Sequence, residues 1–327
     1  LMLDQFGRRI TYLRISVIDK CNLRCLYCMP SGYASRNRIS ELLTNDELVE
    51  LATIFAELGI TKIRLTGGEP LLRPGLVEMV NRLSRIPGIA QLAMSTNGVL
   101  LARHARALKA AGLQRVNVSL DTLSRETFAL ITGLDQWHAV VDGILEAKAA
   151  GLEPVKINTV LMKGVNDDEI LPLAAFAIEQ QLELRFIEWM PTNPLVDRER
   201  EDRFLSNEVA RALIERHYRL IPDDPDPHSP ARSFIIEGTG ARVGFINPLS
   251  NVFCAMCNRV RLKANGRIKT CLHGREELDL RAMLRRGVPR EIIKQQIAET
   301  VFLRPEQHFL NRSEVAHQDF IMTQVGG

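Results

Sequence analysis

Residues 14–28 read RISVIDKCNLRCLYC, in which an apolar, β-branched run is followed at once by three closely spaced cysteines. The run is typical of a β-strand, and the loop after it carries Cys21, Cys25 and Cys28. Three thiols this close together are typical ligands of one metal centre, either zinc or an iron–sulfur cluster. Zinc needs a fourth ligand, and the nearest histidine downstream is His104. A cluster held by three cysteines instead leaves one iron open to a substrate.

Downstream of this stretch, short apolar runs alternate with amphipathic segments, which predicts βα units around a parallel sheet. The capping-box pair Thr44 and Glu47, with Gly59 as a stop, marks the first helix, and Pro74 marks the entry of the second. A doubly wound sheet and a partial barrel both fit the recurring unit, and both bind ligands at the carboxyl ends of their strands. We therefore expect the active site at those ends. The six expected strands span residues 14–19, 62–66, 91–95, 116–121, 154–161 and 183–189.

A proline-rich stretch, IPDDPDPHSPAR at residues 221–232, interrupts this pattern and predicts a linker or a long excursion. After this stretch, the sequence pattern changes and predicts short strands and a few helices. We predict two domains, a barrel over residues 1–220 and a smaller α+β region over residues 221–327. In the second region, strands are expected at 233–237, 242–247 and 258–263, and helices at 278–286 and 290–300.

The composition excludes several classes of protein. With 327 residues, 46% of them hydrophobic and 25% charged, the chain is that of an ordinary globular protein. Its net charge of +3 is too small to indicate DNA, RNA or an anionic membrane as the main partner. No apolar run reaches the roughly 18 residues that span a bilayer, and the start lacks the apolar segment of a secretory signal. We expect a bacterial cytoplasmic protein that binds neither nucleic acid nor membrane.

A second cysteine set lies near the other end of the chain and consists of Cys254, Cys257 and Cys271. Two distant sets of three cysteines are a poor disulfide pattern and a good metal pattern. Arg259 and Arg261 follow, and on a strand they would share one face. Guanidinium groups match phosphate or carboxylate oxygens, so the pair favours an anionic ligand beside the metal. The alternative is a zinc knuckle completed by His273.

Further cations accompany the expected strands. A triphosphate carries about four negative charges, and cations inside a barrel are costly unless they are paired. Each cation alone also fits a solvated strand end, but together they favour an anionic ligand. They are Arg14, Lys62, Arg64, Lys156 and Arg185.

The cysteine motif after the first strand, together with Thr66-Gly67-Gly68-Glu69-Pro70 after the second, resembles the radical S-adenosylmethionine (SAM) superfamily. The resemblance implies an α/β fold, a partial (βα)6 TIM-like barrel, with a [4Fe-4S] cluster whose open iron binds SAM. It also implies that Tyr27 lies near the adenine and Gly68 near the methionine amino group. A glycine fits there because backbone approaches a ligand closely only without a Cβ.

With both cysteine sets considered, the chain resembles the GTP 3′,8-cyclase family over nearly its whole length. This implies a second [4Fe-4S] cluster, held by the second cysteine set, whose open iron contacts the guanine of GTP. It also implies that the terminal Gly326 and Gly327 reach into the active site as part of the catalytic machinery. The implied SAM pocket is lined by Tyr27, Gly68, Ser119 and Met190. The implied GTP-binding residues are Arg14, Arg64, Ser95, Lys156, Arg259, Val260 and Arg261, with Lys62 and Arg185 as further basic residues of the cavity.

The activity implied by this resemblance is that of a lyase in molybdenum cofactor biosynthesis. GTP would be cyclised to (8S)-3′,8-cyclo-7,8-dihydroguanosine 5′-triphosphate while SAM is cleaved to 5′-deoxyadenosine and methionine. The implied partners are a reducing electron donor, a second copy of the chain, and cyclic pyranopterin monophosphate synthase as the next enzyme. One alternative is another radical SAM enzyme with an auxiliary cluster that acts on a peptide or other small molecule. A non-enzymatic zinc protein that binds RNA or a partner is less favoured, because only 6% of the residues are aromatic.

Overall fold

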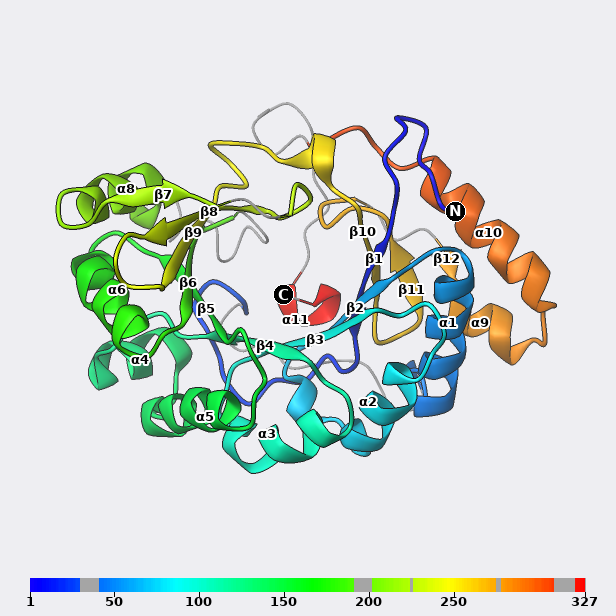
Figure 1. Ribbon diagram of the computed structural model, residues 1–327. Coiled ribbons are helices and arrows are strands. Elements are labelled where there is room, and N and C mark those ends of the chain that lie inside the picture. The colour runs from blue at the N-terminus through cyan, green and yellow to red at the C-terminus, as the bar shows by residue number, and fades with distance from the viewer. Residues whose placement is uncertain (30–40, 191–201, 224–225, 275–277, 309–320, 327) are drawn as a thin grey trace.

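The computed structural model describes residues 1–29, 41–190, 202–223, 226–274, 278–308 and 321–326. Within them, one twelve-stranded sheet curves around the centre of the molecule (Figure 1), in the order β12-β11-β10-β1-β2-β3-β4-β5-β6-β9-β8-β7. No helix in this part of the chain is both long enough and apolar enough to cross a membrane.

The middle of the sheet confirms the predicted partial (βα)6 barrel. Its six strands are parallel and follow one another in chain order, which excludes the doubly wound alternative. The first strand is displaced from its expected position at 14–19, because beyond Ser16 the chain leaves the ladder and Ile18 accepts a hydrogen bond from Gly68 N at 2.7 Å. The strands are β1 (Tyr12–Ser16), β2 (Lys62–Thr66), β3 (Gln91–Thr96), β4 (Arg115–Ser119), β5 (Lys156–Leu161) and β6 (Glu183–Glu188).

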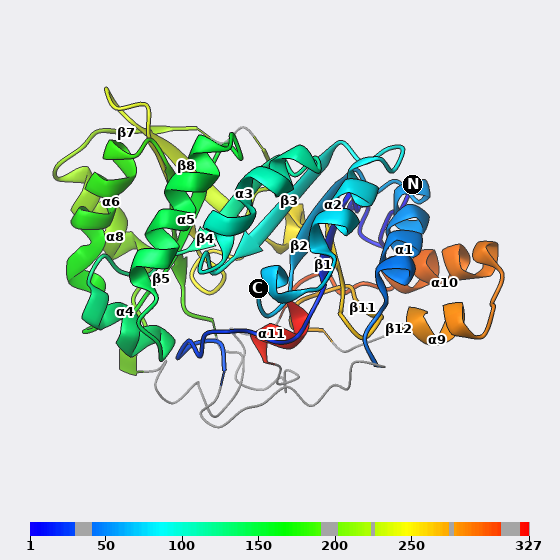
Figure 2. The same cartoon turned by 90° about the horizontal axis from the view of Figure 1, so that it is seen from below.

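Helices cover the outer face of these strands (Figure 1; Figure 2 gives the view from below). The predicted capping box is present, since Glu47 N donates to Thr44 Oγ1 at 3.1 Å and Thr44 N donates to Glu47 Oε2 at 2.8 Å. The second helix begins at Leu76, after a left-handed Gly75 rather than directly after Pro74. The helices of this part are α1 (Asn45–Glu57), α2 (Leu76–Ser84), α3 (Leu101–Ala110), α4 (Arg125–Thr132), α5 (Trp137–Ala149), α6 (Ile170–Glu179) and α8 (Asn207–Glu215), with short 3-10 turns at η2 (Pro70–Leu72) and η3 (Asp167–Glu169).

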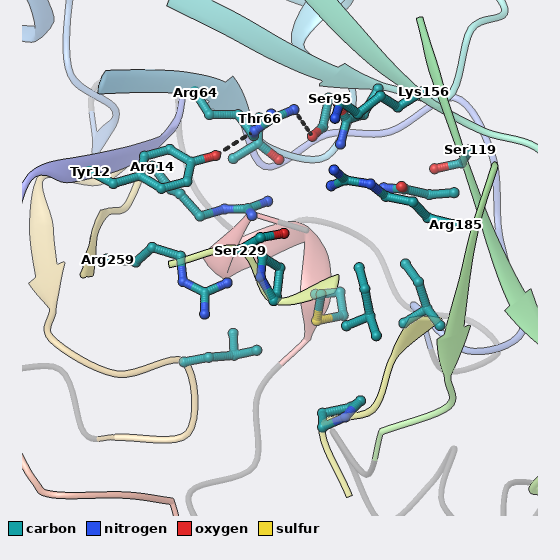
Figure 3. A pocket seen from close by; sticks show the side chains of 18 of the residues that line it. Tyr12, Arg14, Arg64, Thr66, Ser95, Ser119, Lys156, Arg185, Ser229 and Arg259 are labelled. Atoms are coloured by element: carbon teal, nitrogen blue, oxygen red, sulfur yellow. Dashed lines mark hydrogen bonds between the residues drawn. The ribbon is translucent and has the colours of Figure 1, made fainter. Parts of the chain in front are cut away.

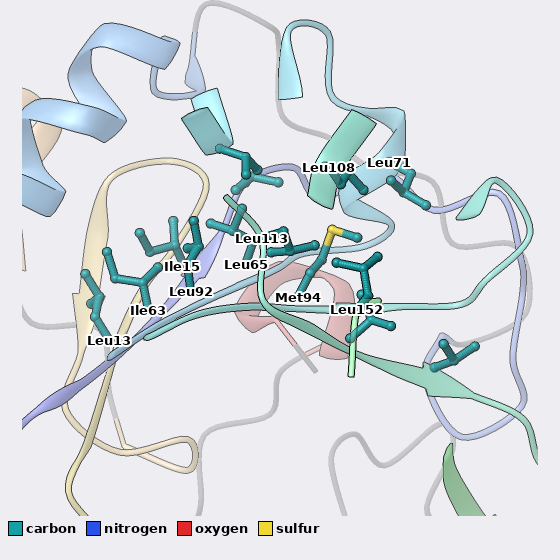
Figure 4. Close-up of a cluster of buried hydrophobic side chains, with 14 of the residues drawn as sticks. Leu13, Ile15, Ile63, Leu65, Leu71, Leu92, Met94, Leu108, Leu113 and Leu152 are labelled. Carbon is teal, nitrogen blue, oxygen red and sulfur yellow. The ribbon is translucent and has the colours of Figure 1, made fainter. Parts of the chain in front are cut away.

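The hydrophobic core lies between the strands and these helices (Figure 4). Leu13 and Ile15 of β1, like Ile63 and Leu65 of β2, are at most 1% exposed. Burial of each such side chain contributes about 2 kcal/mol. Because side chains alternate across a strand, Tyr12, Arg14 and Ser16, or Lys62, Arg64 and Thr66, point to the other side, into the barrel.

The C-terminal region extends both edges of the same sheet. β9 (Arg242–Ile246) runs parallel to β6, and β10 (Arg259–Leu262) runs parallel to β1. Both ends of the predicted linker are in fact strand, because residues 221–222 belong to β7 and residues 231–232 to β8. Pro222 lies in the edge strand of the sheet, where proline is tolerated. The domain division at residue 220 stays a prediction. The remaining elements are β7 (Leu220–Pro222), β8 (Ala231–Ile236), η4 (Cys254–Met256), β11 (Arg267–Lys269), β12 (Leu278–Asp279), α9 (Leu280–Arg285), α10 (Arg290–Phe302) and α11 (Met322–Val325).

Candidate active site

Both cysteine sets open into one cavity of about 940 Å³ inside the barrel. The loop of the first set follows the carboxyl end of β1. Cys257 lies two residues before β10, which is parallel to β1, and Cys271 lies two residues after the antiparallel β11. Both therefore lie toward the amino end of β1. The active site was expected at the carboxyl ends of the strands. That position is correct for the first cysteine set only, because the second set lies at the amino end of β1. The cavity runs along the barrel from one set to the other.

The turn after β2 packs tightly on the first cysteine loop. Glu69 N donates to Lys20 O at 2.8 Å, and a Cβ built on Gly68 would lie 2.1 Å from the same oxygen. A Cβ on Gly67 would lie 2.3 Å from Ile18 O. Glycine is thus required here by the neighbouring backbone, which is a different reason from the close approach of a ligand expected from the sequence.

Glu69 joins the ends of β2 and β3 beside this loop. Its fully buried carboxylate accepts hydrogen bonds from Thr96 Oγ1 at 2.7 Å and from Asn97 N at 2.7 Å. Burial raises the pKa of Glu69 to about 7. Asn97 Nδ2 in turn lies 3.6 Å from the sulfur of Cys21, so the carboxylate helps to fix a group that contacts a thiol.

The four residues expected to line the SAM pocket, Tyr27, Gly68, Ser119 and Met190, all line the cavity. The Tyr27 hydroxyl donates to Asp121 Oδ2 at 2.6 Å, and its ring meets the edge of Trp189 at a centroid distance of 6.3 Å. Burial raises the pKa of Asp121 to about 6. Aromatic faces with a fixed polar tip are suited to a flat heterocycle such as adenine.

The expected cations line the cavity between the two cysteine sets. Figure 3 shows the side chains of Arg14 and Arg64 extending toward those of Lys156 and Arg185. Strand register places Arg14 opposite Arg64 and Arg261 in one row. Tyr12, Lys62 and Arg259 form the next row toward the amino ends. Like charges so close together in a buried space cost free energy until an anion joins them.

The opposite wall carries Lys156 and Arg185, and these cations share a carboxylate. Glu183, which is 8% exposed, lies 2.5 Å from Lys156 Nζ and 2.6 Å from the Arg185 guanidinium. Burial and the nearby Arg185 lower the pKa of Lys156 to about 8. On the wall formed by β1, β2 and β10, burial lowers the pKa of Arg14 to about 10. Ser95 accepts a hydrogen bond from Arg64 at 3.3 Å.

Two arginines contact Cys257 of the second cysteine set, and one of them carries no motif in the sequence. Arg304, only 4% exposed, donates to the sulfur of Cys257 at 2.9 Å and to its carbonyl oxygen at 3.0 Å. Arg259 Nε lies 3.4 Å from the same sulfur. Burial alone would raise the pKa of Cys257, but Arg259 and Arg304 outweigh it and lower the pKa to about 6. A thiol in such surroundings is readily deprotonated, as a metal ligand must be.

The alternative of a zinc site completed by His273 has partial support, because His273 lines the same cavity as the second cysteine set. His273 and His308 line the cavity with their rings 5.4 Å apart. Among the described residues, however, no three Cys, His, Asp or Glu side chains converge closely enough to hold a single metal ion. Wider spacing is expected where each thiolate binds a different iron of a cluster.

Val260 and Gly326 are two further residues that the sequence predicts for the site. Val260 is 1% exposed and belongs to the hydrophobic core on the far side of β10, so only its backbone is available to the cavity. Gly326 lies against the barrel wall: Arg261 donates to its carbonyl oxygen, and a Cβ on Gly326 would lie 2.5 Å from Thr66 Cγ2. Helix α11 before it lies beside β1 in both overall views (Figure 1, Figure 2). Gly327 lies outside the described residues.

Comparisons with known proteins show which families the chain resembles. Residues 15–177 match the Radical SAM superfamily, and residues 182–310 match the Molybdenum Cofactor Synthesis C family. The chain is 42% identical over 327 residues to the GTP 3′,8-cyclase of Peptoclostridium acidaminophilum, covering 100% of this chain and 98% of the relative. It is 45% identical over 307 residues to that of Thermodesulfovibrio yellowstonii, covering 93% and 95%.

A solved structure supports the fold. The crystal structure of Streptococcus suis SuiB bound to S-adenosylmethionine superimposes with a TM-score of 0.62 at 12% sequence identity. The match covers 91% of this chain and 66% of SuiB. At this identity the likeness concerns the architecture alone.

Proposed function

The chain belongs to the GTP 3′,8-cyclase family of the radical SAM superfamily, and from this we infer that it is a lyase that cyclises GTP to (8S)-3′,8-cyclo-7,8-dihydroguanosine 5′-triphosphate while cleaving SAM to 5′-deoxyadenosine and methionine. This is an early step of molybdenum cofactor biosynthesis. The observation that carries the proposal is the single cavity that reaches from one cysteine set to the other with cations between them. Such a cavity suits a substrate with a heterocycle at one end and several negative charges.

The first cysteine set has the donors that a [4Fe-4S] cluster needs. Cys21, Cys25 and Cys28 would supply three thiolates from a loop that the Gly67-Gly68 turn holds in place. When bound, the cluster supplies the electron that cleaves SAM and so provides the 5′-deoxyadenosyl radical. Tyr27, Gly68, Ser119 and Met190 would hold SAM beside it.

A second [4Fe-4S] cluster at Cys254, Cys257 and Cys271 is part of the proposal. Its support is the third thiol brought to the same cavity by β11 and the two arginines directed at the sulfur of Cys257. Guanidinium groups stabilise thiolates, and hydrogen bonds to sulfur are a general means of tuning such centres. Backbone and side chains at this end would hold the guanine.

The cations would bind the triphosphate and so align the ribose with SAM. Binding energy from phosphates remote from the reacting carbon can be used for that alignment. We assign this role to Arg14, Lys62, Arg64, Lys156, Arg185, Arg259 and Arg261, with the Ser95 hydroxyl and the Val260 backbone beside them. Gly326, whose carbonyl oxygen accepts from Arg261, stays a predicted part of the catalytic machinery, as does Gly327. A reducing electron donor, a second copy of the chain and cyclic pyranopterin monophosphate synthase stay predicted partners.

Arg261→Ala is expected to weaken GTP binding about 100-fold, because a charge-assisted contact to phosphate is worth about 1.5–3 kcal/mol. Isothermal titration of the anaerobic enzyme with GTP measures this, and mass spectrometry of the product measures cyclisation. Arg82→Ala is the matched control, since Arg82 of the outer helix α2 pairs with Asp46 of α1, and it should behave as wild type. Unchanged GTP affinity and cyclisation in Arg261→Ala would contradict the phosphate-binding role assigned to Arg261.

Lys156 predicts a pH dependence. Its pKa of about 8 in the free cavity should rise when a triphosphate binds, so above pH 8 binding requires proton uptake and GTP affinity should fall, by up to about tenfold per pH unit. In Lys156→Arg the charge persists, and the loss of affinity between pH 8 and 9 should be smaller. Lys148→Arg, on the outside of the barrel where Lys148 donates to Gln180 O, serves as the control. A slope in Lys156→Arg as steep as that of wild type would contradict the assignment of Lys156.

A further inference from the structure

Tyr12 lies at the centre of the cation cluster although no motif of the sequence marks it as a site residue. Its ring lines the cavity and is 8% exposed. The phenol oxygen accepts a hydrogen bond from Arg64 Nε at 2.5 Å, and the ammonium group of Lys62 lies 4.6 Å from the ring centroid. Figure 3 shows the hydroxyl directed toward Arg64, with Arg14 on the other side. Position and direction of the phenol are therefore fixed by two cations.

Among the residues that the structure describes, no acceptor receives the hydrogen of this phenol, whose one side-chain hydrogen bond is the one from Arg64. A tyrosine hydroxyl both donates and accepts, whereas lysine and arginine side chains can only donate. Asp226, a carboxylate beside this cluster, pairs with Lys62 at 3.8 Å. Six charged groups face Tyr12 or the residues that it contacts, and they come from β1, β2, β4, β10 and the segment before β8. They are Arg14, Lys62, Arg64, Arg115, Arg259 and Asp226.

We propose that Tyr12 is a further substrate-binding residue, whose neutral hydroxyl, held by Arg64, donates its hydrogen to a phosphate oxygen of the nucleotide. The inference rests on the proposed function, because it takes GTP as the substrate. An anionic oxygen is the acceptor that this phenol lacks, and the cations around it are the groups that would bring such an oxygen there. The same contact couples nucleotide binding to the protonation state of Tyr12.

The direction of that coupling follows from the charges around the phenol. Burial alone would raise the pKa of Tyr12, but the cations, above all Arg64 and Arg14, outweigh it and lower the pKa to about 7. Below pH 7 the phenol is neutral and donates to phosphate. Above pH 7 the phenolate must first take up a proton, so the advantage of the hydroxyl disappears.

The test compares wild type with Tyr12→Phe in the anaerobic, cluster-loaded enzyme, by titration with GTP and with guanosine at pH 6.5 and pH 8.5. The variant keeps the ring under Lys62 and loses only the hydroxyl. We expect it to bind GTP about tenfold more weakly at pH 6.5 and about as well as wild type at pH 8.5, with guanosine binding equal in both proteins. Tyr218→Phe, which alters a tyrosine outside the cavity, should match wild type throughout.

Several results would overturn the inference. A loss of GTP affinity that is equal at both pH values would assign the hydroxyl a purely structural role, and an equal loss for guanosine would place the contact on the nucleoside. Unchanged GTP affinity at pH 6.5 would also contradict it. A wild-type enzyme that binds GTP at neither pH would overturn the proposed function itself. Iron content and reductive SAM cleavage, which should be unchanged in Tyr12→Phe, verify that the variant is folded.

Discussion

Cys254→Ser is expected to abolish formation of the cyclised nucleotide while reductive cleavage of SAM continues. The two cysteine sets lie at opposite ends of the barrel, since one follows β1 and the other precedes β10, its parallel neighbour. Effects at well-separated sites are independent to within about 0.5 kcal/mol, so SAM cleavage should stay within about twofold of wild type. Cyclisation should fall at least about 100-fold, because the group that aligns the guanine is lost.

The measurement is a parallel assay of 5′-deoxyadenosine and of cyclised GTP from the same anaerobic reaction. Cys25→Ser is the matched control, because the same substitution in the first set should abolish both products. Equal loss of both products in Cys254→Ser would contradict the assignment and give the second set a purely structural role.

Gly68→Ala should destroy the first metal centre and leave the second intact. The added Cβ would lie 2.1 Å from Lys20 O and 3.0 Å from Cys21 N, both of them backbone atoms that cannot move without shifting the cysteine loop. A displacement of about 1 Å at a reacting group can cost about 100-fold in rate, so SAM cleavage should fall by at least that factor. We expect about half of the bound iron to be lost as well.

Gly238→Ala is the control for this substitution. Gly238 lies in the turn between β8 and β9 with a φ of +76° and no atom within 4 Å of a built Cβ. Alanine there should lower the free energy of unfolding by about 1–2 kcal/mol through backbone strain alone and leave the iron content unchanged. Full iron content and normal SAM cleavage in Gly68→Ala would contradict the packing argument.

Local patterns were enough to predict the six strands of the barrel and the cysteine loop after the first of them. Hydrophobic periodicity identified all six barrel strands, and the capping box of Thr44 and Glu47 identified the start of α1. These features depend on neighbours in the chain, which a sequence displays directly. The family resemblance, rather than periodicity, decided between a partial barrel and a doubly wound sheet.

Non-local pairing could not be predicted in the same way. Whether β10 adds to β1 or to another strand depends on contacts between residues 247 positions apart, such as Tyr12 and Arg259. That pairing places the second cysteine set at the amino ends of the strands and builds the cation rows. It also directs Val260 into the core, which the resemblance alone did not reveal.

Several residues of the site carry no motif of their own. Arg304 donates to Cys257 from 47 residues further along the chain, and Glu183 holds Lys156 and Arg185 from within a strand. A buried arginine beside a thiol, or a carboxylate among cations, is recognised only when the partners are seen together. For Glu183, the one available signal was a charged residue in an otherwise buried strand.

The central claim is that one cavity brings GTP to SAM between two iron–sulfur clusters. Its most direct test is to reconstitute the protein anaerobically with iron and sulfide, count the iron per chain, and analyse the reaction with dithionite, SAM and GTP by mass spectrometry. We predict about eight irons per chain, with 5′-deoxyadenosine and a cyclised isomer of GTP that forms only when both substrates are present. About four irons, or SAM cleavage with GTP left untouched, would contradict the claim and favour a radical SAM enzyme with a different substrate.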